Sequence, residues 1–491
     1  VHAWVRSATR GDIPLRCVVT EAASGRVVAE ATAQVAAGDR DERTAAVTIP
    51  LPGCRAWSPD DPFLYRVTVH SPGDAIDARF GMRTFHLDPA TGMGVLNGRP
   101  YPMRGSNITL YRFFEDGARG ALPWQADWVR RLHVEAKEMH WNTLRYCIGF
   151  PPDFWYDIAD ELGVLIQDEF PIWLEMAKPG ALNADVLATQ YADWMRERWN
   201  HPSVVLWDSC NETKAPETAA AIRRVRHLDL SQRPWDNSWG ETVEPGDASE
   251  QHLYHFSEPK FTLPRLAQAK PADWKPGKPA VILNEYGWLW LNRDGTPTTL
   301  TRTLYRNLAG PTATVAQRRA LYARHLAAET EFWRHSRSCA AVLHFCMLGY
   351  SRSDGQTSDH WSDPAALTWE PEFRAHVRDA FAPVSVMIGT WADRFAPGST
   401  PTISVSVIND TPTPWSGTLR LLLTLPDGTV VEERQPCAVA ALGRQQASFT
   451  LRLPDQATDD ARLEATLIGG DADGVRSVRV VRLTQDRKSV V

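Results

Sequence analysis

The chain is 491 residues long, which exceeds one ordinary hydrophobic core and predicts about three domains unless one of them is a large barrel. Hydrophobic residues make up 43% of the chain and charged residues 23%, proportions that are typical of a globular protein in water. The net charge of −6 offers no basic surface for a phosphate backbone, and no apolar stretch approaches the roughly 18 residues that span a bilayer, so neither nucleic acid nor a membrane is expected as a partner.

Short β-rich runs occupy the first part of the chain. Residues 16–19, 46–49 and 64–69 are such runs, and clusters of Gly, Pro and Asp separate them. Short strands at this spacing favour a small β-sandwich. We therefore expect an immunoglobulin-like β-sandwich over residues 1–88.

Apolar strand-like runs alternate with amphipathic helices from residue 89 to residue 382. In the segment 124–140, Trp128, Leu132, Ala136 and Met139 fall on one helical face. Further helices are predicted at 154–162, 191–199 and 316–333, and strands at 142–146, 164–166, 204–207, 280–283 and 340–343. Repeated βα units predict a (β/α)₈ TIM barrel, whose chemistry lies at the carboxyl ends of its strands.

The helical signal stops after Pro383. Residues 402–407 alternate apolar with polar side chains, and the segment 425–428, Leu-Pro-Asp-Gly, is typical of a hairpin turn. We expect a second β-sandwich over residues 383–491.

Two of the predicted barrel strands end in glutamate. The apolar run that starts at Val204 leads to Asn211-Glu212, and the run that starts at Val281 leads to Asn284-Glu285. A single strand-end glutamate is more often a salt-bridge partner than a catalyst. Two of them supply what glycosidic cleavage requires, because one carboxyl group protonates the leaving oxygen while the other attacks the anomeric carbon. Their separation leaves room for about three βα units, which would put them on the fourth and seventh strands.

Motifs in a fixed order support this interpretation. They are Phe80-Gly81-Met82-Arg83, Leu96-Asn97-Gly98-Arg99-Pro100, Met103-Arg104-Gly105-Ser106-Asn107, Asn142-Thr143-Leu144-Arg145, the run from Tyr156 to Glu169, Asn200-His201-Pro202-Ser203, Asn211-Glu212 and Asn284-Glu285-Tyr286-Gly287. Together they resemble glycoside hydrolase family 2, which includes β-galactosidases, β-glucuronidases and β-mannosidases. The family normally carries a jelly-roll domain before the first sandwich, and nothing here fills that role, so we expect the chain to begin one domain late.

The resemblance implies a retaining mechanism with Glu212 as general acid/base and Glu285 as nucleophile. It also implies that Asn211 binds the sugar 2-hydroxyl group. Arg104 and Arg145 would hold nearby carboxylates in place, either for catalysis or as buried structural ion pairs. The expected substrate-binding residues are Asn211, Arg104, Asn107, Arg145, Trp207, Asp168, His252, Tyr254, His255, Tyr286, Trp288, His344, Asp359, His360 and Trp361.

Several of these residues have a plain structural alternative. His252, Tyr254 and His255 fall where a sixth strand should end; there they either line the sugar pocket, with Tyr254 donating to Glu285, or pack in the core. His344 follows the predicted eighth strand, where the family usually places a tryptophan. Residues 351–363 form a polar, aromatic loop after that strand, and its Asp359, His360 and Trp361 either contact substrate or belong to a solvated surface.

The sequence departs from the β-galactosidase-like pattern at two points. Ile108-Thr109 stand where those members carry a histidine, and Tyr146-Cys147 stand where a Ser-His pair is common. Both changes point away from standard β-galactosidase specificity. No basic cluster that would select an acidic sugar can be located from the sequence.

The leading hypothesis is an exo-acting retaining β-glycosidase that takes an oligosaccharide or glycoside as its substrate. A β-mannosidase or a uronic-acid-releasing relative is the rival among enzymes, a non-catalytic carbohydrate-binding relative is the rival from another class, and an unrelated metal-dependent barrel is the third. The seven cysteines form no CxxC pair, and no calcium-loop pattern is present, so neither a cofactor nor a metal is expected. Homo-oligomer formation and a periplasmic, secreted or cytoplasmic location are left open.

Overall fold

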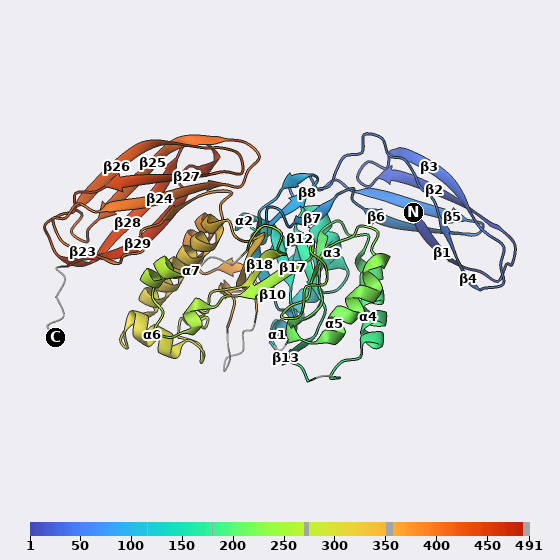
Figure 1. Ribbon diagram of the computed structural model, residues 1–491, viewed down its shortest axis with the longest axis horizontal. Helices are drawn as coiled ribbons and strands as arrows, with labels where there is room; N and C mark the ends of the chain where they lie inside the picture. Colours follow the sequence, from blue (N-terminus) through green and yellow to red (C-terminus); the bar gives the residue numbers. More distant parts are fainter. Residues whose placement is uncertain (115, 179, 270–273, 350–356, 485–491) are drawn as a thin grey trace.

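The structure is a computed structural model that describes all residues except 115, 179, 270–273, 350–356 and 485–491. A barrel surrounded by helices lies in the middle of an elongated molecule, and a β-rich domain lies at each end (Figure 1). This arrangement confirms the expected fold class, a TIM barrel flanked by β-rich domains. The domain limits expected at residues 88 and 382 stay predictions.

The N-terminal domain is built on a four-stranded antiparallel sheet. Its order is β3-β2-β5-β6, and β1 and β4 form a separate pair. Along β2, Ile13, Leu15, Cys17 and Val19 are buried in alternation with more exposed residues, as expected for a sheet with one face on a core. The strands are β1 (His2–Arg6), β2 (Ile13–Glu21), β3 (Val27–Val35), β4 (Glu42–Ala46), β5 (Tyr65–Ser71) and β6 (Asp74–Phe80), and a small sheet of β7 (Phe85–Asp88), β8 (Met93–Leu96) and β9 (Arg99–Pro100) follows.

Eight parallel strands form the barrel. Their order is β16-β14-β12-β11-β10-β19-β18-β17. β16 and β17 have no ladder between them among the described residues, so the barrel has a seam at this point. The strands are β10 (Met103–Ile108), β11 (Thr143–Tyr146), β12 (Leu165–Glu169), β14 (Val204–Asp208), β16 (Trp235–Asp236), β17 (Ala248–His252), β18 (Ala280–Glu285) and β19 (Ala341–Leu348).

Helices cover the outside of the barrel (Figure 1). They are α1 (Leu110–Phe114), α2 (Ala126–Glu138), α3 (Phe154–Leu162), α4 (Ala184–Arg198), α5 (Pro216–Val225), α6 (Arg302–Ala309), α7 (Val315–Ser336) and α8 (Pro371–Ala380). Local sequence fixes several ends: Asn183 caps α4 by accepting from Asp185 N and Val186 N, and Thr314 and Gln317 form a capping box on α7. The predicted helices at 154–162 and 316–333 are confirmed as α3 and α7, whereas the helix predicted at 191–199 is the second half of the longer α4. Among the helices that the structure describes, none has the length and apolar character needed to cross a bilayer.

Two short parallel strands extend the barrel on its carboxyl side. They are β13 (Trp173–Met176) and β15 (Asn211–Lys214), and Trp173 is paired with Asn211. Short 3₁₀ turns complete the loops: η1 (Leu122–Trp124), η2 (Arg226–Leu228), η3 (His255–Ser257) and η4 (Leu263–Gln268). A hairpin of β20 (Trp361–Asp363) and β21 (Thr368–Trp369) precedes α8.

The C-terminal domain consists of two sheets, antiparallel except for the parallel pair β23 and β29, and it has a core of its own. One sheet has the order β22-β24-β27 and the other β23-β29-β28-β25-β26. The predicted turn at 425–428 is confirmed, because Gly428 N donates to Leu425 O at 3.0 Å between β25 and β26. The elements are β22 (Val384–Ile388), β23 (Arg394–Phe395), β24 (Thr402–Asn409), β25 (Trp415–Thr424), β26 (Val430–Val439), β27 (Arg444–Thr450), β28 (Thr458–Ile468), η5 (Gly470–Ala472) and β29 (Arg476–Leu483).

Candidate active site

Two glutamates face each other at the carboxyl end of the barrel. Glu285 is the last residue of β18 and is 5% exposed, and Glu212 is the second residue of β15, directly after the fourth barrel strand. One carboxylate oxygen of each lies within 4.8 Å of the other. Glu212 has a φ of 39°, a left-handed backbone conformation that is uncommon for a residue with a side chain and is often found at functional sites.

Two hydrogen-bond donors hold Glu285. Arg145 Nη1 donates to Glu285 Oε1 at 2.7 Å, and the Tyr254 hydroxyl group donates to Glu285 Oε2. Burial and the negative charge of Glu285 raise the pKa of Tyr254 well above its ordinary value, so the phenol keeps its proton at neutral pH. The carboxylate is therefore fixed in position from two sides.

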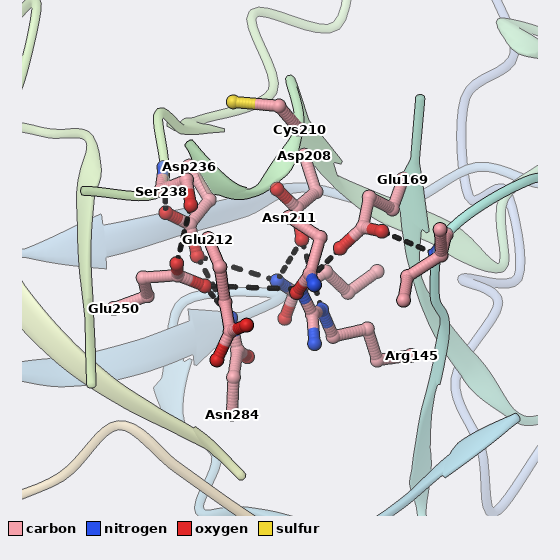
Figure 2. A network of polar contacts seen from close by, with 12 residues as sticks. Arg145, Glu169, Asp208, Cys210, Asn211, Glu212, Asp236, Ser238, Glu250 and Asn284 are labelled. Atoms are coloured by element: carbon pink, nitrogen blue, oxygen red, sulfur yellow. Dashed lines mark hydrogen bonds and ion pairs between the residues drawn. The ribbon is translucent and has the colours of Figure 1, made fainter. Parts of the chain in front are cut away.

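Arg145 is the centre of a buried polar network (Figure 2). It comes from β11, is fully buried, and lies beside carboxylates from four barrel strands. Burial opposes its charge, but the surrounding carboxylates outweigh this effect and raise its pKa well above the ordinary value. Its partners are Glu169, Asp208 at 3.0 Å, Glu285 at 2.7 Å, Asn211 Oδ1 at 3.0 Å, Asn107 Oδ1 at 3.2 Å and, more distantly, Glu250 at 3.8 Å.

Glu212 contacts two different side chains. His252 Nδ1 lies 2.9 Å from Glu212 Oε1, and Trp173 Nε1 donates to Glu212 Oε2 at 3.1 Å. The other ring nitrogen of His252 lies 3.2 Å from Glu250 Oε2, so both ring nitrogens face carboxylates and can both donate only in the imidazolium form. Burial opposes that charge, whereas Glu285 and Glu250 outweigh it and raise the pKa of His252 well above its ordinary value.

A second layer of acids lies beneath the two glutamates. Asp208, Asp236 and Glu250 are buried, and each has a carboxylate oxygen within 4.8 Å of the others (Figure 2). Gln167 Nε2 donates to Asp208 at 2.9 Å, and Asn284 Nδ2 donates to Glu250 at 2.7 Å. Burial raises the pKa of Asp208 to about 6 despite Arg145, and burial together with Glu250 raises the pKa of Asp236 well above its ordinary value.

These acids are arranged for hydrogen bonding. Glu212, His252 and Glu285 each place one possible ligand atom within 4.8 Å of the others, and Asp208, Asp236 and Glu250 form a second such group. In the lower layer, amide N–H groups of Gln167 and Asn284 are directed at the carboxylates. The expectation that no metal or cofactor is bound stays a prediction.

The structure brings together about half of the expected site residues. They are Glu212, Glu285, Asn107, Arg145, Asn211, His252, Tyr254 and Trp288, of which Trp288 packs beside Tyr254 with 5.0 Å between the ring centroids. Their roles in substrate binding stay predictions.

Arg104 lies away from this group, contrary to the sequence-based expectation. It is the second residue of β10 and is therefore near the amino end of the strand. Its Nε donates to His140 O at 3.0 Å, and its Nη1 lies 3.7 Å from Asp410 in the C-terminal domain. Arg104 thus links the base of the barrel to the next domain.

Four expected residues face the helices instead of the barrel interior. The Asp168 carboxylate accepts from Tyr156 OH at 2.6 Å, and Trp207 Nε1 donates to Asp229 at 2.9 Å. Tyr286 OH pairs with Thr330 on α7 at 2.7 Å. The fourth, His344, packs among Trp141, His360 and Phe373 and is fully buried, so none of the four can contact a substrate in this conformation.

The remaining expected residues also lie in packed surroundings. His255 stacks on Phe261 and Trp333, with centroid distances of 5.1 and 5.4 Å. In the loop after β19, residues 351–356 lie outside the described residues, and Asp359 pairs with Arg293 at 2.7 Å. His360 and Trp361 are buried against the aromatic rings of Phe373 and Trp369. The loop residues are structural in this conformation, which corrects the expectation of substrate contact.

Several site residues were not predicted. Glu169 and Glu250 contact Arg145 and His252, Trp173 contacts Glu212, and Trp290 and Phe345 join Tyr254 and Trp288 in one hydrophobic cluster. Glu169 directly follows Asp168, so the prediction found the correct strand end. It chose the wrong one of two adjacent residues, because the sequence does not reveal which of them faces the barrel interior. Trp173 carried no signal, because the strand that it begins, β13, is only four residues long.

Comparisons with known proteins agree with this geometry. Residues 124–310 match the family model described as glycosyl hydrolases family 2, TIM barrel domain. A putative beta-glucuronidase of Formosa agariphila is 26% identical over 265 residues, which cover 52% of this chain and 25% of that protein. The beta-galactosidase BgaC of Bifidobacterium adolescentis is 27% identical over 198 residues, covering 36% of this chain and 18% of that protein.

Solved structures show the same fold over nearly the whole chain. The beta-D-mannosidase of Dictyoglomus thermophilum superposes with a TM-score of 0.71 at 15% identity, covering 98% of this chain and 64% of that one. The exo-chitosanase CsxA of Amycolatopsis orientalis gives 0.70 at 16% identity, covering 99% and 61%. The chain thus spans less than two thirds of these relatives' own length. Residues 124–310 of this chain therefore belong to the TIM barrel domain of glycoside hydrolase family 2.

Proposed function

We propose that this chain carries the catalytic barrel of a retaining exo-β-glycosidase, which hydrolyses terminal β-linked sugars from an oligosaccharide or glycoside. The observation that carries the proposal is the facing pair Glu212 and Glu285, with carboxylate oxygens within 4.8 Å of each other. Retaining enzymes hold their two carboxyl groups about 5–5.5 Å apart, whereas inverting enzymes need about 6.5–9.5 Å to admit a water molecule. The short separation supports double displacement.

Glu285 is the nucleophile in this scheme. Its oxygen forms a bond to the anomeric carbon while the bond from that carbon to the leaving oxygen breaks. Arg145 and Tyr254 each donate to one oxygen of Glu285, so the carboxylate is oriented for attack.

Glu212 is the acid and then the base. It gives a proton to the departing oxygen, and in the second step it takes a proton from the water that attacks the glycosyl-enzyme. His252 Nδ1 lies 2.9 Å from Glu212 Oε1 and fixes this oxygen in position. Trp173 fixes the other oxygen at 3.1 Å.

The surrounding residues suit a sugar ring. Asn211 Oδ1 already accepts from Arg145, which leaves its amide N–H₂ group to donate to a sugar hydroxyl. Tyr254, Trp288, Trp290 and Phe345 form an aromatic wall beside Glu285, and such rings pack against the C–H faces of sugars. The names of the relatives, which include beta-galactosidase, beta-glucuronidase and exo-chitosanase, support an exo-acting β-glycosidase.

The test is hydrolysis of a panel of p-nitrophenyl β-glycosides: galactoside, glucoside, mannoside, glucuronide, galacturonide and glucosaminide. We expect the wild type to cleave at least one of them with the anomeric configuration retained in the first product seen by NMR. Glu285→Gln should lower kcat by about 10³-fold or more, because the attacking oxygen is lost. Glu241→Gln, an exposed glutamate paired with Arg223, is the matched control and should behave like the wild type.

Leaving-group dependence separates the two roles. Glu212→Gln should lose turnover of glycosides with poor leaving groups but keep the first step with a dinitrophenyl leaving group, which needs no proton. Activity that survives Glu285→Gln would overturn the assignment of the pair, and an inverted product would overturn the mechanism. A wild type that binds oligosaccharides but cleaves none would instead favour a non-catalytic carbohydrate-binding protein.

A further inference from the structure

A half-buried arginine that forms no ion pair with any described residue lies beside the candidate active site. Arg112 follows β10 on the short helix α1, and its Nε donates to Tyr111 OH at 2.6 Å. Within the part of the chain that the structure describes, it forms no ion pair with a carboxylate, in contrast to Arg145. Removing a guanidinium group from water is costly unless it is paired, so an unpaired, half-buried arginine calls for a functional reason.

Arg112 is separated from the acid/base residue by one aromatic ring. Its guanidinium carbon lies 5.4 Å from the ring centroid of Trp173, and the indole N–H of Trp173 donates to Glu212 at 3.1 Å. A cation on the face of an indole ring is held in a defined place.

Arg112 also lies near the hydrophobic cluster beside Glu285. Its positive charge is close enough to interact electrostatically with the thiol groups of Cys147 and Cys346. Both cysteines pack in one cluster with Trp290, Phe345 and Tyr254, and the Tyr254 hydroxyl group donates to Glu285. Arg112 therefore lies between the surroundings of Glu212 and those of Glu285, where a sugar ring would be bound.

The exposed face of this arginine suits one kind of ligand. The Nη1 and Nη2 groups have no hydrogen-bond acceptor among the described residues, and neither is sealed from solvent. A guanidinium group binds a carboxylate through two parallel hydrogen bonds, whereas a neutral sugar has no need of a cation. Lys214, two residues beyond Glu212 on β15, is exposed and likewise forms no ion pair with a described residue, so the rim carries a second positive charge.

We propose that Arg112 binds the carboxylate of a uronic acid, so that the cleaved sugar is a β-linked uronic acid. This inference rests on the proposed glycosidase function and names its substrate class. It also supplies the cation that the sequence alone did not reveal, because Arg112 stands on a helix of only five residues with no recognisable motif.

Matched substrates test the proposal. p-Nitrophenyl β-glucuronide, its methyl ester and the β-glucoside differ only at the carboxyl position, and galacturonide and galactoside form a second set. We expect Arg112→Gln to lower kcat/KM for the better uronide by about 10- to 100-fold, mainly through KM, and to change the neutral substrates by less than about twofold. Arg112→Lys should have a kcat/KM for the uronide between those of the wild type and Arg112→Gln. Lysine keeps the positive charge but cannot form the two parallel hydrogen bonds of a guanidinium group. Arg223→Gln, an exposed arginine paired with Glu241, is the control and should change neither.

Two other results of these assays would overturn the assignment of Arg112 to the uronic acid carboxylate. An equal fall for uronide, ester and glucoside would mean that Arg112 merely positions Trp173. A wild type that cleaves the neutral sugars and not the uronides would remove this inference and leave the proposed function standing.

Calorimetric binding of free glucuronate and glucose to the wild type and Arg112→Gln provides a readout without turnover. Selective glucuronate binding that is lost in the variant supports the site even if no substrate of the panel is cleaved, in which case only the proposed function fails. Equal or absent binding of both sugars would count against the site.

Discussion

The single positive charge of Arg145 is surrounded by several carboxyl groups, which would carry more negative charge than it can neutralise if all of them were ionised. Glu169, Asp208 and Glu285 all lie at hydrogen-bond distance from it, and Asp236 and Glu250 belong to the same buried layer. His252 adds one more positive charge. Several ionised carboxylates cannot share a buried site at this ratio, so some of them must keep their protons at neutral pH. Burial accordingly raises the pKa of Glu169 well above its ordinary value in spite of Arg145.

This proton retention makes stability depend on pH. The pKa of Asp208 is raised by burial to about 6, above the ordinary value near 3.9 of an unfolded aspartate. The folded state therefore binds a proton that the unfolded state has released, so the stabilisation is present below about pH 4 and is lost as pH rises through about 6. Asp208→Asn cannot titrate, and its amide oxygen can still accept from Arg145 and Gln167.

We expect the stability of Asp208→Asn relative to the wild type to increase by about 2 kcal/mol between pH 4 and pH 7. Urea unfolding at a series of pH values measures this difference. Asp193→Asn, an exposed aspartate paired with Arg196 on α4, is the control and should show no such trend. A constant difference across the series would mean that Asp208 is ionised throughout.

At the residue scale, the sequence predicted the positions of the two facing glutamates better than it predicted their surroundings. Glu212 and Glu285 each follow an apolar run, so the strand end was visible. The errors at Asp168, Trp207 and His344 have one cause: side chains on a barrel strand alternate between the interior and the helices, and both faces are buried. Hydrophobicity therefore does not reveal which of two adjacent residues points inward, and Glu169 was missed for its neighbour.

Among the elements, β10 and β11 approach unusually closely. A Cβ atom on Gly105 would lie 1.7 Å from Thr143 O, a backbone atom that cannot move aside without displacing its strand. Asn107 and Arg145 stand on these two strands, in register with each other, so the close approach also positions the centre of the site.

Gly105→Ala should therefore disturb both stability and catalysis. We expect a loss of about 3 kcal/mol or more in the free energy of unfolding, because the strands must separate, and a reduced kcat in whatever protein still folds. Gly246→Ala is the matched control, since a Cβ atom there meets nothing within 4 Å. Chemical denaturation of both variants decides the point, and equal stability would show that the strand pair can relax at little cost.

Elements with a long periodic signal were predicted well, and short ones were not. The amphipathic helices α2 and α3, the long helix α7 and the apolar strands β14, β18 and β19 were visible in the sequence. The fifth barrel strand, β16, is two residues long, and β13 and β15 are four residues each, so no periodicity could develop. Trp173 stands on the short strand β13 and Arg112 on the five-residue helix α1, which explains why these two residues near Glu212 were not foreseen.

On the scale of the whole molecule, one aspartate connects the barrel to the C-terminal domain. Asp410 follows β24 and is bound by Arg334 at 2.6 Å and by Arg337, both from the end of α7, with Arg104 at 3.7 Å. It is nearly fully buried. Burial opposes its charge, but the arginines outweigh this effect and lower its pKa to about 2.

Asp410→Asn should leave three arginines without their counter-charge. Breaking a buried ion pair in this way costs about 3–5 kcal/mol, so we expect the domain interface to weaken and thermal unfolding to separate into two transitions. Differential scanning calorimetry is the measurement, with Asp393→Asn, an exposed aspartate of the same domain, as control. A single transition at the wild-type temperature would show that apolar contacts alone hold the domains together.

The seam of the barrel lies next to the segment that serves both glutamates. His252 ends β17 and contacts Glu212, and Tyr254, two residues later, contacts Glu285. β17 is hydrogen-bonded to β18 alone, with no ladder to β16 among the described residues. A small sliding of β17 thus breaks fewer backbone bonds than the same movement of an inner strand would. Because both contacts come from this one segment, such a movement would shift the hydrogen bonds of Glu212 and Glu285 together.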